Sequence, residues 1–326
     1  MDVFVNNVLL SNEIIVFLFT QIILLTLLTI SFFYSLSIIK NWDYSKTTQE
    51  QYKLEKRSYL VILIISFTMI IKIFLMPYFT YSIDILSHIV PGAMCAAGVI
   101  GANDYGQPLL SFKVILLFFI GIWMILNTLD LKEKTYPYTK KKFYFFILIF
   151  LLVIIETVLD ILYLTNISTQ EPVLCCSVIF GASSTGSQIP FNLNIPMLLV
   201  LFYLLYFLSI FVNIQKNPYL NILVNILFIY ISYYAVTYFF GTYVYQLPTH
   251  QCPFCMLQHE YFYIGYFIWG SLFLGVFFAF AYAVLKLLIN KSLDYTLMYS
   301  LIFNTLFVLI CTFYTLRFYF VNGVFL

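Results

Sequence analysis

The strongest constraint in this sequence is a set of continuous apolar runs, each long enough to cross a lipid bilayer as a helix. About 20 apolar residues are needed to span the hydrocarbon core, and eight stretches of the chain reach that length. They cover residues 13–39, 59–80, 109–128, 143–165, 194–213, 220–245, 259–286 and 296–318. Barrel strands alternate apolar with polar residues, whereas these runs are continuous. The sequence therefore predicts an all-α, polytopic transmembrane helical bundle of about eight spans.

Composition argues against the other classes of protein. Hydrophobic residues make up 63% of the 326 residues and charged residues 9%, whereas a soluble domain carries about 25% charged residues. The net charge is only +2, and no basic stripe suggests a nucleic-acid partner. The sequence contains no phosphate-binding GxxxxGK[ST] segment, so we expect no bound nucleotide. We expect residues 1–326 to form one integral membrane domain in contact with membrane lipids.

The positions of lysine and arginine predict the orientation of the chain. Of the 16 Lys and Arg residues, 13 lie in the segments 40–58 and 129–142 and in the later connections on the same side. The alternate loops, 81–108, 166–193 and 246–258, contain none. The positive-inside rule places the basic side in the cytoplasm. We therefore expect both termini and the three loops without lysine or arginine to face outward, toward the periplasm of a bacterial inner (cytoplasmic) membrane.

The three predicted outer loops each carry cysteine, which suggests a weak internal repeat of helix hairpins. The segment MCAAGVIGA (94–102) resembles LCCSVIFGA (174–182), so that Cys95 aligns with Cys175. The third loop contains HQCPFCMLQ (250–258). Shared ancestry of the hairpins would explain the pattern, and so would chance similarity between short membrane sequences.

Five of the six cysteines lie in or beside these loops, in a compartment predicted to be oxidising. Thiols there are bridged, bound to metal or redox-active. Cys252 and Cys255 form a CxxC motif directly before the seventh span, which places Cys255 near a helix N-terminus that would favour the thiolate. Adjacent cysteines such as Cys175 and Cys176 rarely bridge each other, so we expect each to meet a partner elsewhere, with Cys95, Cys252 and Cys255 as candidates. A simple structural bridge is the alternative for the CxxC motif.

Charged residues inside the predicted spans form a second candidate site. Glu156 and Asp160 are four residues apart in one span and therefore share a helix face. Lys72 lies at a similar depth in another span, which predicts an ion pair between Lys72 and Glu156. Charges at this depth indicate either a proton route or ligand site, or a structural pair that fixes helix packing.

The stretch QLPTHQCPFCMLQHEYFYIGYF (246–267) resembles disulfide bond formation protein B (DsbB) and its quinone-reducing relatives. In that family of four-span proteins a CxxC, commonly within CPLCxxQR, lies at the periplasmic start of a transmembrane helix. Cys252, Pro253, Cys255 and Gln258 match, and His259 stands where the family usually has arginine. Cysteine loops that precede the CxxC make the layout similar to that of the vitamin K epoxide reductase group.

The resemblance implies a membrane thiol–disulfide oxidoreductase that relays electrons between outer-face cysteines and a membrane quinone. A periplasmic thiol-redox protein would be the partner of the relay. The implied catalytic residues are Cys252, Cys255, Cys175, Cys176 and Cys95, and the implied quinone contacts are Gln258 and His259.

Two other functions remain open on the sequence alone. The same thiols, together with histidine, would suit a soft metal ion, so the chain could be a copper- or zinc-handling membrane protein. The ligands to Cu(I) or Zn²⁺ would come from Cys175, Cys176, Cys252, Cys255 and His250. The third possibility is a structural subunit of a larger membrane complex.

Overall fold

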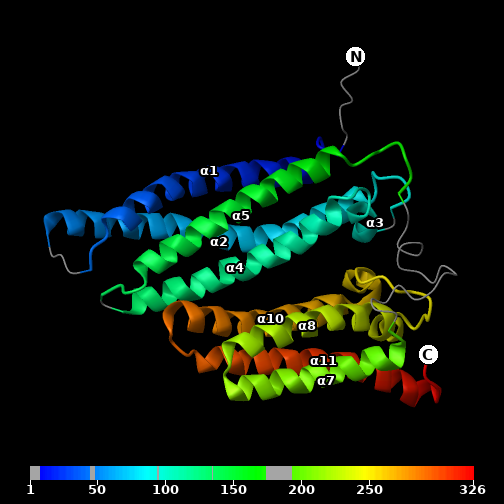
Figure 1. The fold of residues 1–326 in the computed structure, drawn as a ribbon. Coiled ribbons are helices and arrows are strands. Elements are labelled where there is room, and N and C mark those ends of the chain that lie inside the picture. Colours follow the sequence, from blue (N-terminus) through cyan, green and yellow to red (C-terminus); the bar gives the residue numbers. More distant parts are fainter. Residues whose placement is uncertain (1–7, 45–47, 94, 134, 174–192) are drawn as a thin grey trace. The chain divides into compact units, whose positions relative to one another are not determined.

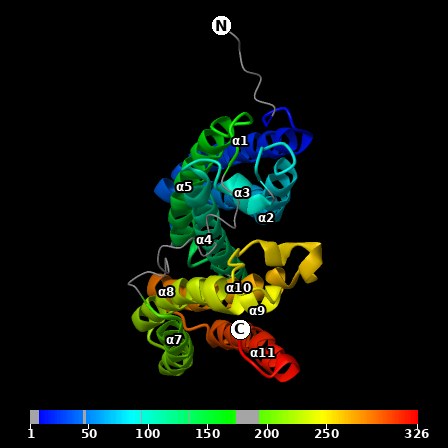
Figure 2. The same cartoon turned by 90° about the vertical axis from the view of Figure 1, so that its right-hand side faces the viewer.

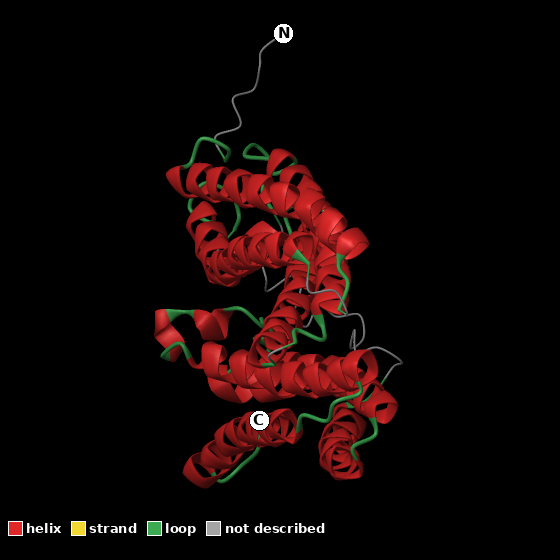
Figure 3. Ribbon diagram, turned by 90° about the vertical axis from the view of Figure 1, so that its left-hand side faces the viewer, coloured by secondary structure: helices red, strands yellow, loops and turns green. Residues whose placement is uncertain are grey.

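The computed structural model describes residues 8–44, 48–93, 95–133, 135–173 and 193–326. Within these ranges all regular secondary structure is helical, as Figure 3 shows. Eight helices of the described chain are long and apolar enough to cross a membrane. The predicted fold class is confirmed, and the protein is an integral membrane protein built from helices.

The chain divides into two compact units, Met1–Val173 and Leu174–Leu326, and each is described by itself. The long helices of the first unit, over its described residues, are α1 (Asn12–Asn41), α2 (Gln49–Leu86), α4 (Gly106–Lys132) and α5 (Thr139–Thr165). Helix α1 packs on α2, α2 on α4, α4 on α5, and α5 packs back on α1 (Figures 1 and 2). The short helix α3 (Ala96–Ile100) lies between α2 and α4 and contacts both.

The second unit repeats this order of long helices. They are α7 (Ile195–Gln215), the composite helix formed by α8 (Pro218–Ala235), η2 (Val236–Phe240) and α9 (Gly241–Tyr245), then α10 (Ile264–Ile289) and α11 (Asp294–Asn322). Helix α7 packs on α8, α8 on α10, α10 on α11, and α11 packs back on α7. Two short 3₁₀ turns, η3 (Cys255–Leu257) and η4 (His259–Tyr261), lie between α9 and α10.

In both units a cysteine-bearing loop joins the second and third long helices. The loop is 87–105 in the first unit, with Cys95, and 246–263 in the second, with Cys252 and Cys255. The predicted hairpin repeat aligns 94–102 with 174–182, and the latter segment lies outside the described residues. Each unit has four long helices that pack in the same order. The hairpin repeat and the single domain over 1–326 stay predictions.

Two helices begin at places that hydropathy does not indicate. Helix α2 starts at Gln49 rather than near residue 59, because Thr48 caps it and the charged residues that follow are good helix formers. Helix α10 starts at Ile264 rather than residue 259. Phe262 and Tyr263 have φ values of 53° and 55°, and this left-handed backbone prevents the helix from starting earlier.

The composite helix of the second unit contains one wider turn. The N–H of Gly241 donates to the carbonyl of Val236, five residues earlier, so the segment 236–240 is a π-helix. A π-turn inserts an extra residue into an α-helix and is frequent near functional sites. Here it lies one turn before Tyr245, whose phenol contacts the cysteine loop.

The outer faces of the long helices carry large apolar side chains. Phe19, Phe33 and Phe74 of the first unit are all strongly exposed, and so are Phe207 and Phe313 of the second. Exposed phenylalanine in such numbers suits hydrocarbon rather than water. These faces are consistent with contact to membrane lipids.

Candidate functional site

The CxxC motif lies in the loop between α9 and α10 of the second unit. The sulfur atoms of Cys252 and Cys255 lie within 4.8 Å of each other. Cys252 is buried, with 2% of its surface exposed, whereas Cys255 is only partly covered. Two sulfurs at this separation can form a disulfide or share a metal ion after a small movement.

Tyr245 holds this loop in place from the end of α9. Its hydroxyl donates to the carbonyl of Cys252 and accepts from the N–H of Met256 at 3.0 Å. The rings of His250 and Tyr261 pack edge-on against the Tyr245 ring, with centroids 4.3 and 4.7 Å away. The backbone on both sides of the motif is therefore tied to one buried side chain.

Two further aromatic residues border the motif. Trp269 of α10 donates its indole N–H to the carbonyl of Pro253 at 3.0 Å, which fixes the residue between the two cysteines. Burial raises the pKa of the Tyr261 phenol, and the nearby Cys255 and Glu260 raise it further. Tyr261 therefore remains a protonated hydrogen-bond donor beside Cys255 at neutral pH.

Cys255 precedes the long helix rather than belonging to it, but its turn η3 packs against the first turn of α10, where a Cβ on Gly265 would lie 2.9 Å from the carbonyl carbon of Met256. The predicted stabilisation of its thiolate by that helix N-terminus stays a prediction. Cys255 opens the three-residue turn η3, and α10 begins only at Ile264. Gln258 directly follows η3 and His259 opens η4, so the expectation that both lie one turn into the long helix is wrong.

The remaining predicted cysteines are placed as follows. Cys95 is the N-cap residue of α3 in the first unit and is 4% exposed. The carboxylate of Asp84 accepts from the N–H of Ala96 at 3.2 Å and so anchors the start of that helix. Cys175 and Cys176 lie outside the described residues.

The predicted pair of Lys72 and Glu156 is present in the first unit. The Lys72 ammonium donates to one carboxylate oxygen of Glu156, and each residue is 4% exposed. Lys113 of α4 joins them, with its Nζ 2.7 Å from Glu156 Oε1 and 2.9 Å from Asp160 Oδ1. The cluster holds two ammonium and two carboxylate groups, so its formal charges cancel.

Every long helix of the first unit contributes to this ionic cluster. The amide oxygen of Gln21 in α1 accepts from Lys72 at 3.0 Å, and its NH₂ donates to Thr157 at 3.0 Å. The ammonium of Lys113 also lies 4.6 Å from the centroid of the Phe79 ring, within cation–π range. A cavity of about 10 Å³ beside Lys72, Lys113 and Glu156 has room for about one water molecule.

Lys113 and Gln21 were absent from the sequence prediction. Lys113 lies within the apolar run 109–128, and an ionisable residue inside such a run is itself a signal of a partnered or functional group. Gln21 carries no charge, and nothing in its sequence context marks it as a partner of Lys72.

A second buried ion pair lies near the opposite end of the first unit. Lys142 was predicted in the polar segment 129–142, but it belongs to α5 and is fully buried. Its ammonium lies 2.6 Å from a carboxylate oxygen of Asp130, which is also fully buried. Asp130 accepts from the N–H of Tyr138 at 2.7 Å as well, so this pair joins α4 to α5.

Known proteins provide no functional assignment for this chain, so a function has to be argued from the residues described above. No protein-family model, no curated protein and no solved structure matches the chain.

Proposed function

We propose that this protein is a membrane thiol–disulfide oxidoreductase whose Cys252–Cys255 pair exchanges electrons with a membrane quinone. The observation that carries the proposal is the approach of the two CxxC sulfurs to within 4.8 Å, in a loop whose backbone is held by Tyr245. The sequence resemblance of residues 246–267 to quinone-linked thiol oxidoreductases supports the same chemistry.

The proposed reaction transfers two electrons and two protons from the CxxC pair to quinone. The thiols of Cys252 and Cys255 lose two protons and two electrons and form one S–S bond, and a quinone takes up both to become a quinol. The sulfur of Cys255 is more accessible than that of Cys252, so Cys255 is the cysteine that reacts with the quinone. The buried Cys252 completes the bridge.

The residues around the motif fit a quinone head group. Such a group needs hydrogen-bond donors for its carbonyl oxygens and flat apolar surfaces beside its ring. Gln258 is half-buried, His259 is exposed, and the His259 ring lies 6.0 Å from that of Tyr263. Gln258 and His259, with the protonated phenol of Tyr261, would hold the head group, and bound quinone would supply two-electron chemistry.

The proposal also includes the side of the membrane that the cysteine loops face and the protein with which they exchange thiols. We infer from the charge asymmetry that the cysteine loops face the periplasm of a bacterial inner membrane, where a thiol-redox protein would exchange with Cys95, Cys175 or Cys176. A membrane-impermeant thiol reagent applied to intact cells after reduction should label Cys255. Labelling only in inverted vesicles would contradict this orientation.

The test of function is the thiol state of the motif in isolated membranes. After reduction, a short-chain ubiquinone analogue should oxidise the pair, with one quinol formed per disulfide, as followed by mass spectrometry. Cys252→Ser and Cys255→Ser should each abolish quinol formation, whereas Cys311→Ser, a change within α11, should leave it intact. A pair that does not respond to the analogue would contradict the proposal.

Two further measurements separate the alternatives. Stoichiometric Cu(I) or zinc that is lost in either CxxC variant, with indifference to quinone, would assign metal handling instead. A permanently bridged, metal-free and unresponsive pair would leave a structural role. His259→Arg, which restores the residue usual in the resembling family, should retain activity, and His259→Ala should weaken quinone use.

A further inference from the structure

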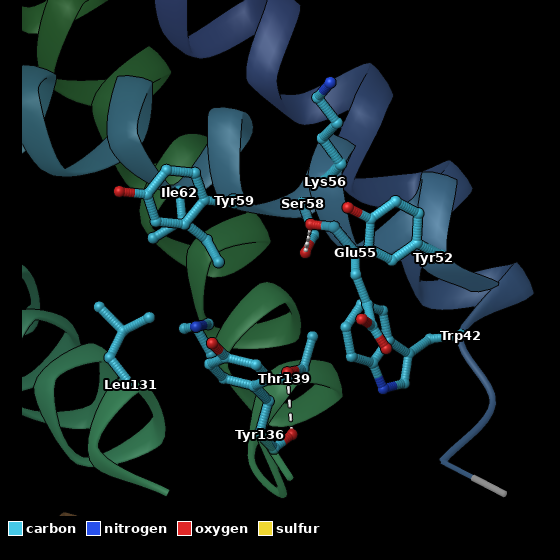
Figure 4. A pocket seen from close by; sticks show the side chains of 11 residues that line it. Trp42, Tyr52, Glu55, Lys56, Ser58, Tyr59, Ile62, Leu131, Tyr136 and Thr139 are labelled. Atoms are coloured by element: carbon cyan, nitrogen blue, oxygen red, sulfur yellow. Dashed lines mark hydrogen bonds between the residues drawn. The ribbon is translucent and has the colours of Figure 1, made fainter. Parts of the chain in front are cut away.

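One pocket of the first unit, lined by both polar and apolar side chains, lies away from the residues assigned to redox chemistry. It has a volume of about 340 Å³ and lies beside the α1–α2 and α4–α5 connections (Figure 4). Small-molecule sites in proteins range from about 300 to 1,000 Å³. The pocket is therefore large enough for a polar head group but too small for a whole lipid.

One face of α2 forms a wall of this pocket. Tyr52, Glu55, Tyr59 and Ile62 follow a spacing of three or four residues and so share a helix face. In the view of Figure 4, Trp42, Tyr52 and Glu55 lie on one side, and Tyr59, Ile62 and Leu131 lie on the other. The pocket thus has a polar, aromatic side and an apolar side.

This division coincides with the polar–apolar boundary of the helices. On α2 the charged residues of the first turns end at Arg57 and the apolar run follows, and on α4 the apolar run 109–128 ends shortly before Asp130 and Leu131. Tyrosine and tryptophan are enriched where a membrane helix meets the head-group layer. The pocket therefore lies at the depth where lipid head groups lie.

The polar side of the pocket carries one unpaired charge and one buried donor without an acceptor. The carboxylate of Glu55 is exposed and has no ion-pair partner in the described part of the chain. Trp42 is 95% buried, and its indole N–H has no hydrogen-bond acceptor among the described residues. Of the two lysines that line the pocket, Lys142 is paired with Asp130, and Lys56 extends away from Trp42 in Figure 4.

We propose that this pocket binds the head group of a zwitterionic, ammonium-bearing phospholipid. The ammonium lies beside Glu55 and the rings of Trp42 and Tyr52, because aromatic faces and a carboxylate both attract an organic cation. Lys56 offers the positive charge for the phosphate at the rim. The start of the acyl chain follows Ile62 and Leu131 toward the apolar part of the helices.

The test is native mass spectrometry of the full-length protein with phospholipids that differ only in head group. Phosphatidylethanolamine should bind about tenfold more tightly than phosphatidylglycerol, which has the phosphate but no ammonium. Glu55→Gln should remove this preference. Glu50→Gln is the matched control, since Glu50 lies in the first turn of the same helix and does not line the pocket.

A second variant and a soluble probe distinguish the source of the ammonium group. Lys56→Gln should weaken both phospholipids alike and leave their ratio unchanged. Dodecyltrimethylammonium, which has an ammonium and a chain but no phosphate, should bind more weakly than phosphatidylethanolamine and should be insensitive to Lys56→Gln. Equal or tighter binding of phosphatidylglycerol, a preference that survives Glu55→Gln, or tighter binding of dodecyltrimethylammonium would overturn the proposal.

Discussion

The ionic cluster of the first unit predicts unequal costs for removing its charges. Glu156 accepts hydrogen bonds from both Lys72 and Lys113. Over the described residues, Lys72 bonds only to Glu156 and to the amide oxygen of Gln21. Glu156→Leu therefore leaves the Lys72 ammonium without a charged partner, whereas Lys72→Met leaves Glu156 paired with Lys113.

The magnitudes follow from these contacts. Stranding one charge of a buried pair costs about 3–5 kcal/mol of unfolding free energy, which we expect for Glu156→Leu. Lys72→Met should cost about 1–3 kcal/mol, because Lys113 remains 2.7 Å from Glu156 while the hydrogen bond to Gln21 is lost. The double variant keeps the balanced pair of Lys113 and Asp160. Its cost should be below the sum of the single costs by at least about 1 kcal/mol.

The assay is reversible unfolding of the purified protein in mixed micelles by SDS, followed by circular dichroism. The matched control is the ion pair of Lys216 and Asp294, which has a 2.6 Å separation but side chains 49% and 58% exposed. Removing either partner there should cost no more than about 1 kcal/mol. Additive costs for Lys72 and Glu156, or a Lys72→Met cost equal to that of Glu156→Leu, would refute the reasoning.

Three further predictions concern packing and the cysteine loop. Asp130→Asn leaves the fully buried ammonium of Lys142 without a charged partner, although the amide oxygen of Asn127 still accepts from it at 3.1 Å, and should cost about 3–5 kcal/mol in the same unfolding assay; a cost below about 1 kcal/mol would contradict the pairing. Gly275→Ala places a Cβ 2.0 Å from a side-chain oxygen and 2.9 Å from a backbone nitrogen of α11, and should destabilise by about 1–3 kcal/mol. Gly270→Ala, with open space around the new Cβ, is the control and should be neutral or stabilising; equal effects of the two changes would disprove the close approach. Tyr245→Phe removes the hydroxyl that links both sides of the CxxC loop and should speed maleimide labelling of the reduced pair, and an unchanged rate would show that the loop is held by other contacts.

The membrane-spanning helices were predictable because an apolar run of this length has few other stable folds. The eight runs correspond to the eight long helices of the described chain. Hydropathy could not indicate that α2 begins at Gln49, since polar helical turns have no hydropathy signal. It also could not show the delayed start of α10, which depends on the left-handed backbone of Phe262 and Tyr263. The grouping of helices into two units depends on side-chain packing rather than on the length of any run.

Contacts in the candidate sites could be predicted where the spacing of residues along the chain brings them together. Matched depth in two spans was enough to predict the pair of Lys72 and Glu156, and a two-residue spacer keeps Cys252 near Cys255. Lys113 was missed because a single lysine in an apolar run has no partner at a fixed sequence distance. Its contacts with Glu156 and Asp160 arise only when α4 packs on α5.

The position of the cysteine loop depends on the number of residues in the π-turn at 236–240 as well as on which residues they are. Each residue of an α-helix advances the side-chain direction by about 100°. A one-residue deletion inside this segment would regularise the hydrogen-bond ladder and improve the local helix. It would also turn Tyr245 by about 100° away from the carbonyl of Cys252 and the N–H of Met256, which it now joins. Natural variants that lack one residue here should therefore also have lost the tyrosine or the CxxC motif, whereas simple substitutions within the turn should leave both in place.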